Sequence, residues 1–176
     1  MAAFFNLMGL VIFLEIVFIL ISFWTIATLF FTKVPFARTP EANISKAIAQ
    51  LNLPANAKFY DLGCGDGKAL FLAEKLGYRV TGFELSPYPY FRAIIKKYFT
   101  NSKAEIHRSN FFNNNLSQAD GVYLFLIKSI MPRVGEKLKK ELRPGTPVIS
   151  YAFQIPGWQA IKILDTSPSK TYIYHT

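Results

Sequence analysis

The sequence has very few of the side chains that build metal sites and disulfide frameworks. Cys64 is the one cysteine, and the two histidines, His107 and His175, are far apart in the chain. A single cysteine excludes an internal disulfide framework and a cysteine-based metal cluster. We therefore predict no metal site.

Charge is almost missing from the first 32 residues, where Glu15 is the one charged side chain. A bilayer is crossed by about 20 consecutive apolar residues. We predict a transmembrane anchor over residues 1–32, in contact with lipid through residues 4–31. Glu15 is a functional candidate because of this apolar setting; a position at one membrane interface is the simpler explanation.

A secretory signal peptide is the rival interpretation of the apolar segment. No base precedes the segment, it is too long, and no small-residue cleavage site leads into a polar start. Lys33 and Arg38 follow it. By the positive-inside rule, we expect a single-pass membrane protein with its C-terminal domain on the cytoplasmic side, at the inner membrane in a prokaryote.

Acidic residues are outnumbered by basic ones, 11 against 20, which gives a net charge of +9. Such an excess attracts anionic lipid headgroups or nucleic acid. The bases are scattered and no aromatic–basic RNA motif accompanies them, which argues against nucleic acid as the partner.

The remainder of the chain alternates between strand and helix patterns. A proline-punctuated linker at 33–40 leads into a domain at 41–176. This alternation predicts an α/β fold with a parallel, doubly wound, Rossmann-like sheet. Strands are expected at 58–62, 78–84, 104–108, 121–127, 147–153, 161–164 and 171–174, and helices at 41–51, 68–76, 87–99 and 130–142.

A glycine-rich turn follows the first expected strand. Asp61 precedes Gly63, Gly65 and Gly67, which stand at every second position before a helical stretch. Parallel sheets bind nucleotide-like ligands at such turns. A dinucleotide fingerprint has a wider final spacing, and Asp61 and Asp66 would repel its pyrophosphate. An ammonium-bearing ligand without phosphate, such as S-adenosylmethionine, suits the turn better.

Further candidate ligand contacts follow the next two expected strands. Glu84 ends the second strand, where a carboxylate can accept hydrogen bonds from both hydroxyls of a ribose. Asn110 and Phe111 follow the third strand, where an amide can pair with adenine and a ring can pack on it. Asn110 has a simpler explanation as a turn residue, and Phe111 as a core residue. Because Glu84 also suits NAD, the glycine spacing and Asp61 favour S-adenosylmethionine.

These motifs resemble the class I, seven-strand S-adenosylmethionine-dependent methyltransferases. A narrower resemblance is to the membrane-anchored lysine methyltransferases of the mitochondrial ATP synthase c subunit and adenine nucleotide translocase, and their prokaryotic relatives. The resemblance is carried by residues 61–67, Glu84, residues 110–112, the apolar N-terminus, Val34-Pro35-Phe36 with Thr39, and the segments 131–145 and 153–158.

The resemblance implies a membrane-tethered protein-lysine N-methyltransferase that uses S-adenosylmethionine and acts on a membrane protein. It also implies that Thr39 lies near the methionine end of the cofactor and that residues 150–153 lead toward the substrate. Asn110 departs from the pattern, since many members have Asp there. No Asn-Pro-Pro-Tyr motif follows the fourth strand, which argues against methylation of DNA bases or glutamine.

Other functions are compatible with the sequence. A lipid or small hydrophobic acceptor, such as a quinone precursor, is the alternative among methyltransferases. A non-catalytic cofactor-binding or scaffold module at the membrane is the alternative of another class, and an NAD(P)-dependent reductase fits less well. No catalytic base is identified. Three aromatic residues are expected to line an acceptor channel or to pack in the core: Tyr123, Tyr151 and Trp158. The expected cofactor-binding residues are Thr39, Asp61, Gly63, Cys64, Gly65, Gly67, Glu84, Asn110 and Phe111.

Overall fold

The computed structural model describes residues 2–32, 41–167 and 169–176. Contacts divide the chain into two units, Met1–Pro35 and Phe36–Thr176. The first unit contains one helix, α1 (Ala2–Thr32), whose segment Leu7–Trp24 is long and apolar enough to cross a membrane. An N-terminal signal sequence meets the same criterion of length and composition. Glu15 is exposed on α1.

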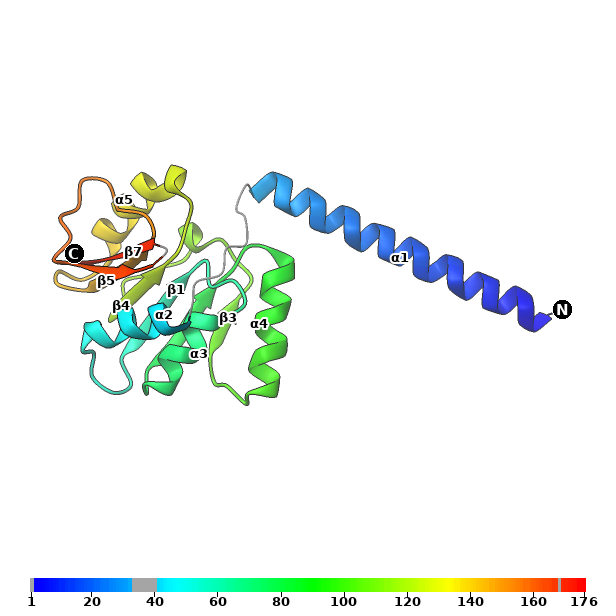
Figure 1. The fold of residues 1–176 in the computed structure, drawn as a ribbon, viewed down its shortest axis with the longest axis horizontal. Helices are drawn as coiled ribbons and strands as arrows, with labels where there is room; N and C mark the ends of the chain where they lie inside the picture. Colours follow the sequence, from blue (N-terminus) through cyan, green and yellow to red (C-terminus); the bar gives the residue numbers. More distant parts are fainter. Residues whose placement is uncertain (1, 33–40, 168) are drawn as a thin grey trace. The chain divides into compact units, whose positions relative to one another are not determined.

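A seven-stranded sheet forms the centre of the second unit (Figure 1). The strand order is β3-β2-β1-β4-β5-β7-β6. From β1 the chain therefore proceeds outward to β3 on one side, then returns to β4 on the other. Doubly wound sheets bind ligands at the carboxyl ends of strands next to such a reversal. The strands are β1 (Lys58–Leu62), β2 (Arg79–Phe83), β3 (Glu105–His107), β4 (Gly121–Leu124), β5 (Pro147–Tyr151), β6 (Lys162–Thr166) and β7 (Ser169–His175).

The expected parallel sheet is correct for β1 to β5, whose neighbouring strands all pair in parallel. The last strand, β7, is antiparallel to both β5 and β6, a direction that the sequence had not assigned. Residues 167–168 alone separate β6 from β7. A connection this short joins antiparallel strands, because a parallel pair needs a crossover of about a dozen residues.

The predicted helices are present with shifts of a few residues at their ends. Ser86 precedes α4 as expected, but its side chain forms no capping hydrogen bond, and Pro87 occupies the first turn. The helices are α2 (Glu41–Ile48), continued by a 3-10 turn (Ala49–Leu51), α3 (Lys68–Lys75), α4 (Pro87–Phe99) and α5 (Met131–Glu141).

Each face of the sheet carries its own apolar core. Ile48 of α2 and Leu70 of α3 pack in one core, and Leu138 of α5 packs in the other. Every residue of β4 is buried, as expected for a strand covered on both faces. β4 ends at Leu124, earlier than predicted, and the chain then turns into a short 3-10 helix (Lys128–Ile130).

Candidate cofactor-binding site

The turn between β1 and α3 has a backbone that requires glycine. Gly63, Gly65 and Gly67 have φ angles of +79°, +58° and +80°, in the region that other residues rarely adopt. The N–H groups of Gly63 and Cys64 both donate to the Phe83 carbonyl, at 2.9 and 3.0 Å. The turn is therefore fixed against the carboxyl end of β2.

Two of these glycines also lie where a side chain would not fit. A Cβ atom on Gly63 would lie 2.8 Å from Leu126 Cδ2, and one on Gly67 would lie 2.7 Å from Phe71 Cε2. Leu126 follows β4, so the segments after two neighbouring strands meet at Gly63. The sequence motif thus reflects both backbone conformation and space.

Asp61 is a buried carboxylate at the centre of the sheet. It lies in register with Gly82 of β2 and Tyr123 of β4 and is 2% exposed. Burial, followed by the negative charges of Glu84 and Asp66, raises the pKa of Asp61 well above its ordinary value. A cationic ligand group would stabilise its ionised form.

Glu84 is held over the glycine turn by two backbone groups. The Gly65 N–H donates to Oε2 at 2.9 Å, and the Ser86 N–H donates to Oε1 at 2.7 Å. Burial raises the pKa of Glu84, and these hydrogen bonds lower it in part. Each oxygen keeps a lone pair, so the carboxylate can still accept from two vicinal hydroxyls. The contact with Ser86 was not predicted from the sequence, although a backbone donor two residues after an acid is a common local pairing.

Asp66 has a different environment from the one that its place in the turn suggested. Its Oδ2 atom lies 2.6 Å from Lys96 Nζ and 3.5 Å from Arg92 Nη2, both on α4. These ion pairs neutralise Asp66, so the argument against a pyrophosphate rests on Asp61 and the glycine spacing. In the sequence, this pairing could have been inferred from Arg92 and Lys96, two bases four residues apart in the expected helix.

Cys64 contributes its backbone to the turn and its side chain to the core. The residue is 6% exposed, and its Sγ atom would lie 2.8 Å from a Cβ atom on Gly82. Burial, and then the charges of Asp61 and Glu84, raises the pKa of the Cys64 thiol well above its ordinary value. The thiol therefore has little thiolate character and is a poor nucleophile.

Asn110 and Phe111 have the structural roles that were their simpler explanations. Asn110 Oδ1 accepts a hydrogen bond from the Phe112 N–H at 3.0 Å and caps the 3-10 turn Phe111–Asn113. Phe111 is 8% exposed and its ring lies 4.4 Å, centroid to centroid, from that of Phe112. The Asn110 amide nitrogen is the group left to meet a ligand. Thr39 lies outside the described residues.

The three aromatic residues proposed for one channel lie on different faces of the sheet. Tyr123 and Tyr151 belong to the core beside α2 and α3, where Phe125 packs edge-on against Tyr151 at 4.9 Å. Trp158 belongs to the other core and packs edge-on against Tyr174 at 5.8 Å. A single channel lined by all three is therefore wrong, and core packing is correct.

The carboxyl end of β5 has a strained backbone. Ala152 has a φ angle of +69°, which is uncommon for a residue with a Cβ atom. The conformation is held by a hydrogen bond from the Ala152 N–H to the Lys170 carbonyl at 2.8 Å, and by one from Ser150 Oγ to the Phe153 carbonyl at 2.6 Å. Such strain is concentrated at functional sites; the course of residues 150–153 toward the substrate stays a prediction.

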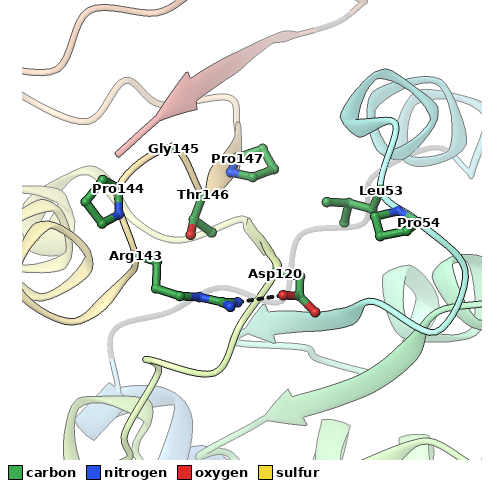
Figure 2. Close-up of a pocket in the computed structure, with 8 residues that line it drawn as sticks. All are labelled: Leu53, Pro54, Asp120, Arg143, Pro144, Gly145, Thr146 and Pro147. Carbon is green, nitrogen blue, oxygen red and sulfur yellow. Dashed lines mark hydrogen bonds and ion pairs between the residues drawn. The ribbon is translucent and has the colours of Figure 1, made fainter.

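A hollow of about 360 Å³ lies at the opposite, amino edge of the sheet (Figure 2). An ion pair between Asp120 and Arg143 crosses it, and the Lys58 N–H donates to Asp120 Oδ2 at 2.7 Å. Ligands of doubly wound sheets bind at the carboxyl edge, so we assign this hollow no part in cofactor binding. Its lining consists of Leu53, Pro54, Asp120, Arg143, Pro144, Gly145, Thr146 and Pro147.

The groups around the glycine turn fit S-adenosylmethionine. Asp61 offers a buried carboxylate to an ammonium group, and Glu84 offers two oxygens to a ribose. The turn itself lets a ligand approach the backbone closely. No part of this arrangement requires a phosphate.

Comparisons with known proteins agree with this chemistry. The family model of the ANTKMT methyltransferase domain matches residues 61–162. A protein-lysine N-methyltransferase from Saccharolobus islandicus is 34% identical over 149 residues, which cover 80% of this chain and 92% of the relative. The mouse adenine nucleotide translocase lysine N-methyltransferase is 26% identical over 81% of this chain, but the match spans 63% of the mouse protein.

A solved structure is also similar over most of the chain. It is an RNA methyltransferase from Salinibacter ruber in complex with S-adenosyl-L-homocysteine, with a TM-score of 0.75 and 25% sequence identity. The match covers 79% of this chain and 93% of that one. The ligand in that structure is the product form of S-adenosylmethionine.

Proposed function

The chain belongs to the ANTKMT methyltransferase domain family, and we propose that it methylates a lysine side chain of a membrane protein while α1 tethers it to the membrane. Membership establishes that the chain is an S-adenosylmethionine-dependent methyltransferase, in a family that contains protein-lysine N-methyltransferases. The observation that carries the proposal is the similarity to the protein-lysine N-methyltransferase from Saccharolobus islandicus. The match covers 92% of that relative and 80% of this chain. The apolar helix α1 supports the tether.

We assign the cofactor contacts to the residues that surround the glycine turn. S-adenosylmethionine, when bound, supplies a methyl group on a positively charged sulfur. Asp61 would hold its ammonium group, and Glu84 would hold its ribose hydroxyls. The backbone of the turn at Gly63, Cys64, Gly65 and Gly67 would lie against it. The Asn110 amide nitrogen and the Phe111 segment would meet the adenine, and Thr39 would lie near the methionine end.

The acceptor lysine must lose its proton before it can attack a methyl carbon. A dry site disfavours the ammonium form and lowers the lysine pKa. Phe125, half-buried after β4 and packed against Tyr151 of β5, supplies apolar surface at the same edge of the sheet as Asp61 and Glu84. Holding donor and acceptor close and in line is then the main source of rate acceleration. No residue is assigned as a general base.

The membrane tether accounts for the choice of acceptor. Two mouse relatives are named for methylation of the adenine nucleotide translocase and of ATP synthase subunit c. The chain spans 63% and 59% of their lengths, respectively. By analogy, the acceptor here would be a membrane protein with a lysine near the bilayer surface. Lys33 and Arg38 after α1 favour a methyltransferase domain on the cytoplasmic side.

Labelled methyl transfer in native membranes tests the proposal. Full-length protein is incubated with membranes and S-adenosylmethionine that carries a labelled methyl group, at a cofactor concentration too low to saturate Glu84→Ala, which is the low-activity control. We expect label in one protein band, at a lysine identified by mass spectrometry. Label in the lipid extract would support the lipid alternative. Label in RNA, which the similar RNA methyltransferase structure and the net charge of +9 suggest as a competitor, would overturn a protein acceptor.

A further inference from the structure

The outward face of α4 is apolar, the reverse of what a surface helix normally presents to water. Every exposed residue of α4 is aromatic or aliphatic. Tyr98 and Phe99 are the extreme cases, at 81% and 80% exposure. The arginine and two lysines of the helix are only half-exposed. The exposed residues are Tyr88, Phe91, Ile95, Tyr98 and Phe99.

These five residues, which we call the α4 stripe, lie along one side of the helix. Tyr88, Phe91, Ile95 and Tyr98 are spaced by three or four residues, and Phe99 follows Ile95 by four, which repeats the helical period. Pro89 and Ala93 are buried on the opposite side, where Ala93 contacts the position of a Cβ atom on Gly67. Leu85, directly before the helix, is also exposed. An apolar surface that runs the length of a helix marks an interaction site.

The charge beside the stripe has a single sign. Residues 85–104 contain four basic side chains and no acidic one. Arg92 lies next to the stripe, with its guanidinium carbon 5.8 Å from the centroid of the Tyr88 ring. Nearby Asp66 is engaged in ion pairs with Arg92 and Lys96, and Glu74 accepts hydrogen bonds from residues 102 and 103. The partner surface must therefore combine apolar and anionic character.

We propose that the α4 stripe docks on the surface of an anionic lipid bilayer, with the helix axis in the membrane plane. Helices with an apolar face and flanking bases bind in this way, and tyrosine rings prefer the headgroup level. Charge complementarity favours lipid over a second copy of this chain. A symmetric dimer through the stripe would bring two identical basic surfaces together, and like charges repel.

The docking would orient the active end of the domain. α4 begins three residues after Glu84, so the start of the stripe lies beside the proposed ribose site. The eight residues between α1 and α2 can span at most about 28 Å, which limits distance but not orientation. A docked α4 would place its first turn, which follows Glu84, at the membrane surface. This inference goes beyond the tether, and its test requires neither catalysis nor an acceptor.

Lipid quenching of a dye on the stripe tests the proposal in the full chain. Phe91→Cys is labelled with a polarity-sensitive fluorophore, since Cys64 is buried and wild-type protein measures any background labelling. Ile163→Cys on β6, also exposed and apolar, is the matched control at the far edge of the sheet. The proteins are reconstituted in phosphatidylcholine vesicles with or without phosphatidylglycerol, each containing nitroxide-labelled lipid.

We expect severalfold stronger quenching at position 91 than at position 163 in phosphatidylglycerol vesicles, with a smaller difference in pure phosphatidylcholine or at high salt. Adding Tyr98→Glu to the Phe91→Cys protein should reduce quenching to the control level, whereas adding Ile163→Glu should not. Equal quenching at both positions would overturn the proposal. A dye whose emission reports a less polar environment without quenching by the nitroxide lipid, to an extent that grows with the protein-to-lipid ratio, would indicate self-association instead. Flotation of the chain with vesicles reports membrane attachment separately, so loss of the tether and loss of docking are distinguishable.

Discussion

The two carboxylates of the site, Asp61 and Glu84, are prepared for binding in different ways. Glu84 accepts two backbone hydrogen bonds and is already fixed in position. Asp61 is more deeply buried, and the negative charges of Glu84 and Asp66 add to the cost of its ionised form. A buried carboxylate beside like charges is destabilising when it is ionised. We therefore expect Asp61 to lower the stability of the free protein, whereas Glu84 is already stabilised by its hydrogen bonds.

Asp61→Asn should stabilise the free protein and abolish tight cofactor binding. The pKa of Asp61 is raised in the folded state, so the folded chain binds its proton more tightly than the unfolded chain. Stability consequently falls as pH rises from the ordinary Asp range through the raised pKa. At neutral pH the substitution should increase the free energy of unfolding by about 1–3 kcal/mol. Urea denaturation measures this, and an unchanged or lower stability would contradict it.

Cofactor affinity should increase with pH over the same window. A cationic ligand binds the ionised form of Asp61, so a proton must leave when the free carboxyl is protonated. Calorimetry with S-adenosylmethionine in buffers of different ionisation enthalpy measures this proton release. We expect cofactor binding to release a fraction of a proton per protein molecule, and this fraction should increase as the pH is lowered. The effect should vanish in Asp61→Asn, and a proton release retained there would assign it to another group.

Glu84→Ala should weaken S-adenosylhomocysteine binding by about 10- to 100-fold, since hydrogen bonds to a charged group contribute about 1.5–3 kcal/mol. The change also removes acceptors from the Gly65 and Ser86 N–H groups, so thermal unfolding must be measured in parallel. Glu84→Gln keeps the shape and should retain part of the affinity. Glu105→Ala, at an exposed acid on β3, is the matched control and should bind normally.

At the scale of elements, the glycine turn links the strands physically. Gly63 contacts the segment after β4 through Leu126 and bonds to the end of β2 through Phe83. A change at Gly63 is therefore transmitted to three strand ends. Gly77, at the end of α3, has a similar φ angle of +86°, but a Cβ atom added there would have no other atom within 4 Å.

Gly63→Ala should consequently cost more stability than Gly77→Ala. Both place a Cβ atom in the left-handed region, at about 1–2 kcal/mol. Gly63→Ala adds a clash with Leu126, and overpacking adds about 1–3 kcal/mol. Chemical denaturation compares the two. S-adenosylhomocysteine affinity should fall in Gly63→Ala alone; equal effects of the two variants would show that conformation, and not close approach, makes glycine necessary.

Features that depend on neighbours in sequence could be predicted, and features that depend on distant packing could not. The turn at 61–67 and Glu84 follow from the strand–glycine–helix order alone. The ion pairs of Asp66 depend on how α4 returns across the sheet. The separation of Trp158 from Tyr151 depends on the path of the segment between β5 and β6, which packs Trp158 against Tyr174. The antiparallel direction of β7 could not be assigned from alternation, because no helix separates β6 from β7.

At the scale of the whole molecule, the chain consists of two units, for which we expect different roles. The unit Phe36–Thr176 contains the sheet, both cores and the glycine turn. The unit Met1–Pro35 contains α1, which buries none of its apolar segment within the chain. Cofactor affinity should therefore be a property of the second unit, and access to a membrane acceptor should depend on the first.

Deletion of residues 1–32 tests this division. We expect S-adenosylhomocysteine affinity to stay within about twofold, because no core residue is removed. Methylation of the acceptor in membranes should fall by about 10²- to 10⁴-fold, the loss that accompanies removal of a tether. Replacing α1 with an unrelated transmembrane helix should restore the rate if α1 only anchors the domain. Failure of the replacement, with membrane insertion confirmed, would instead assign α1 a direct part in recognising the acceptor, for which Glu15 is the one charged candidate within the helix.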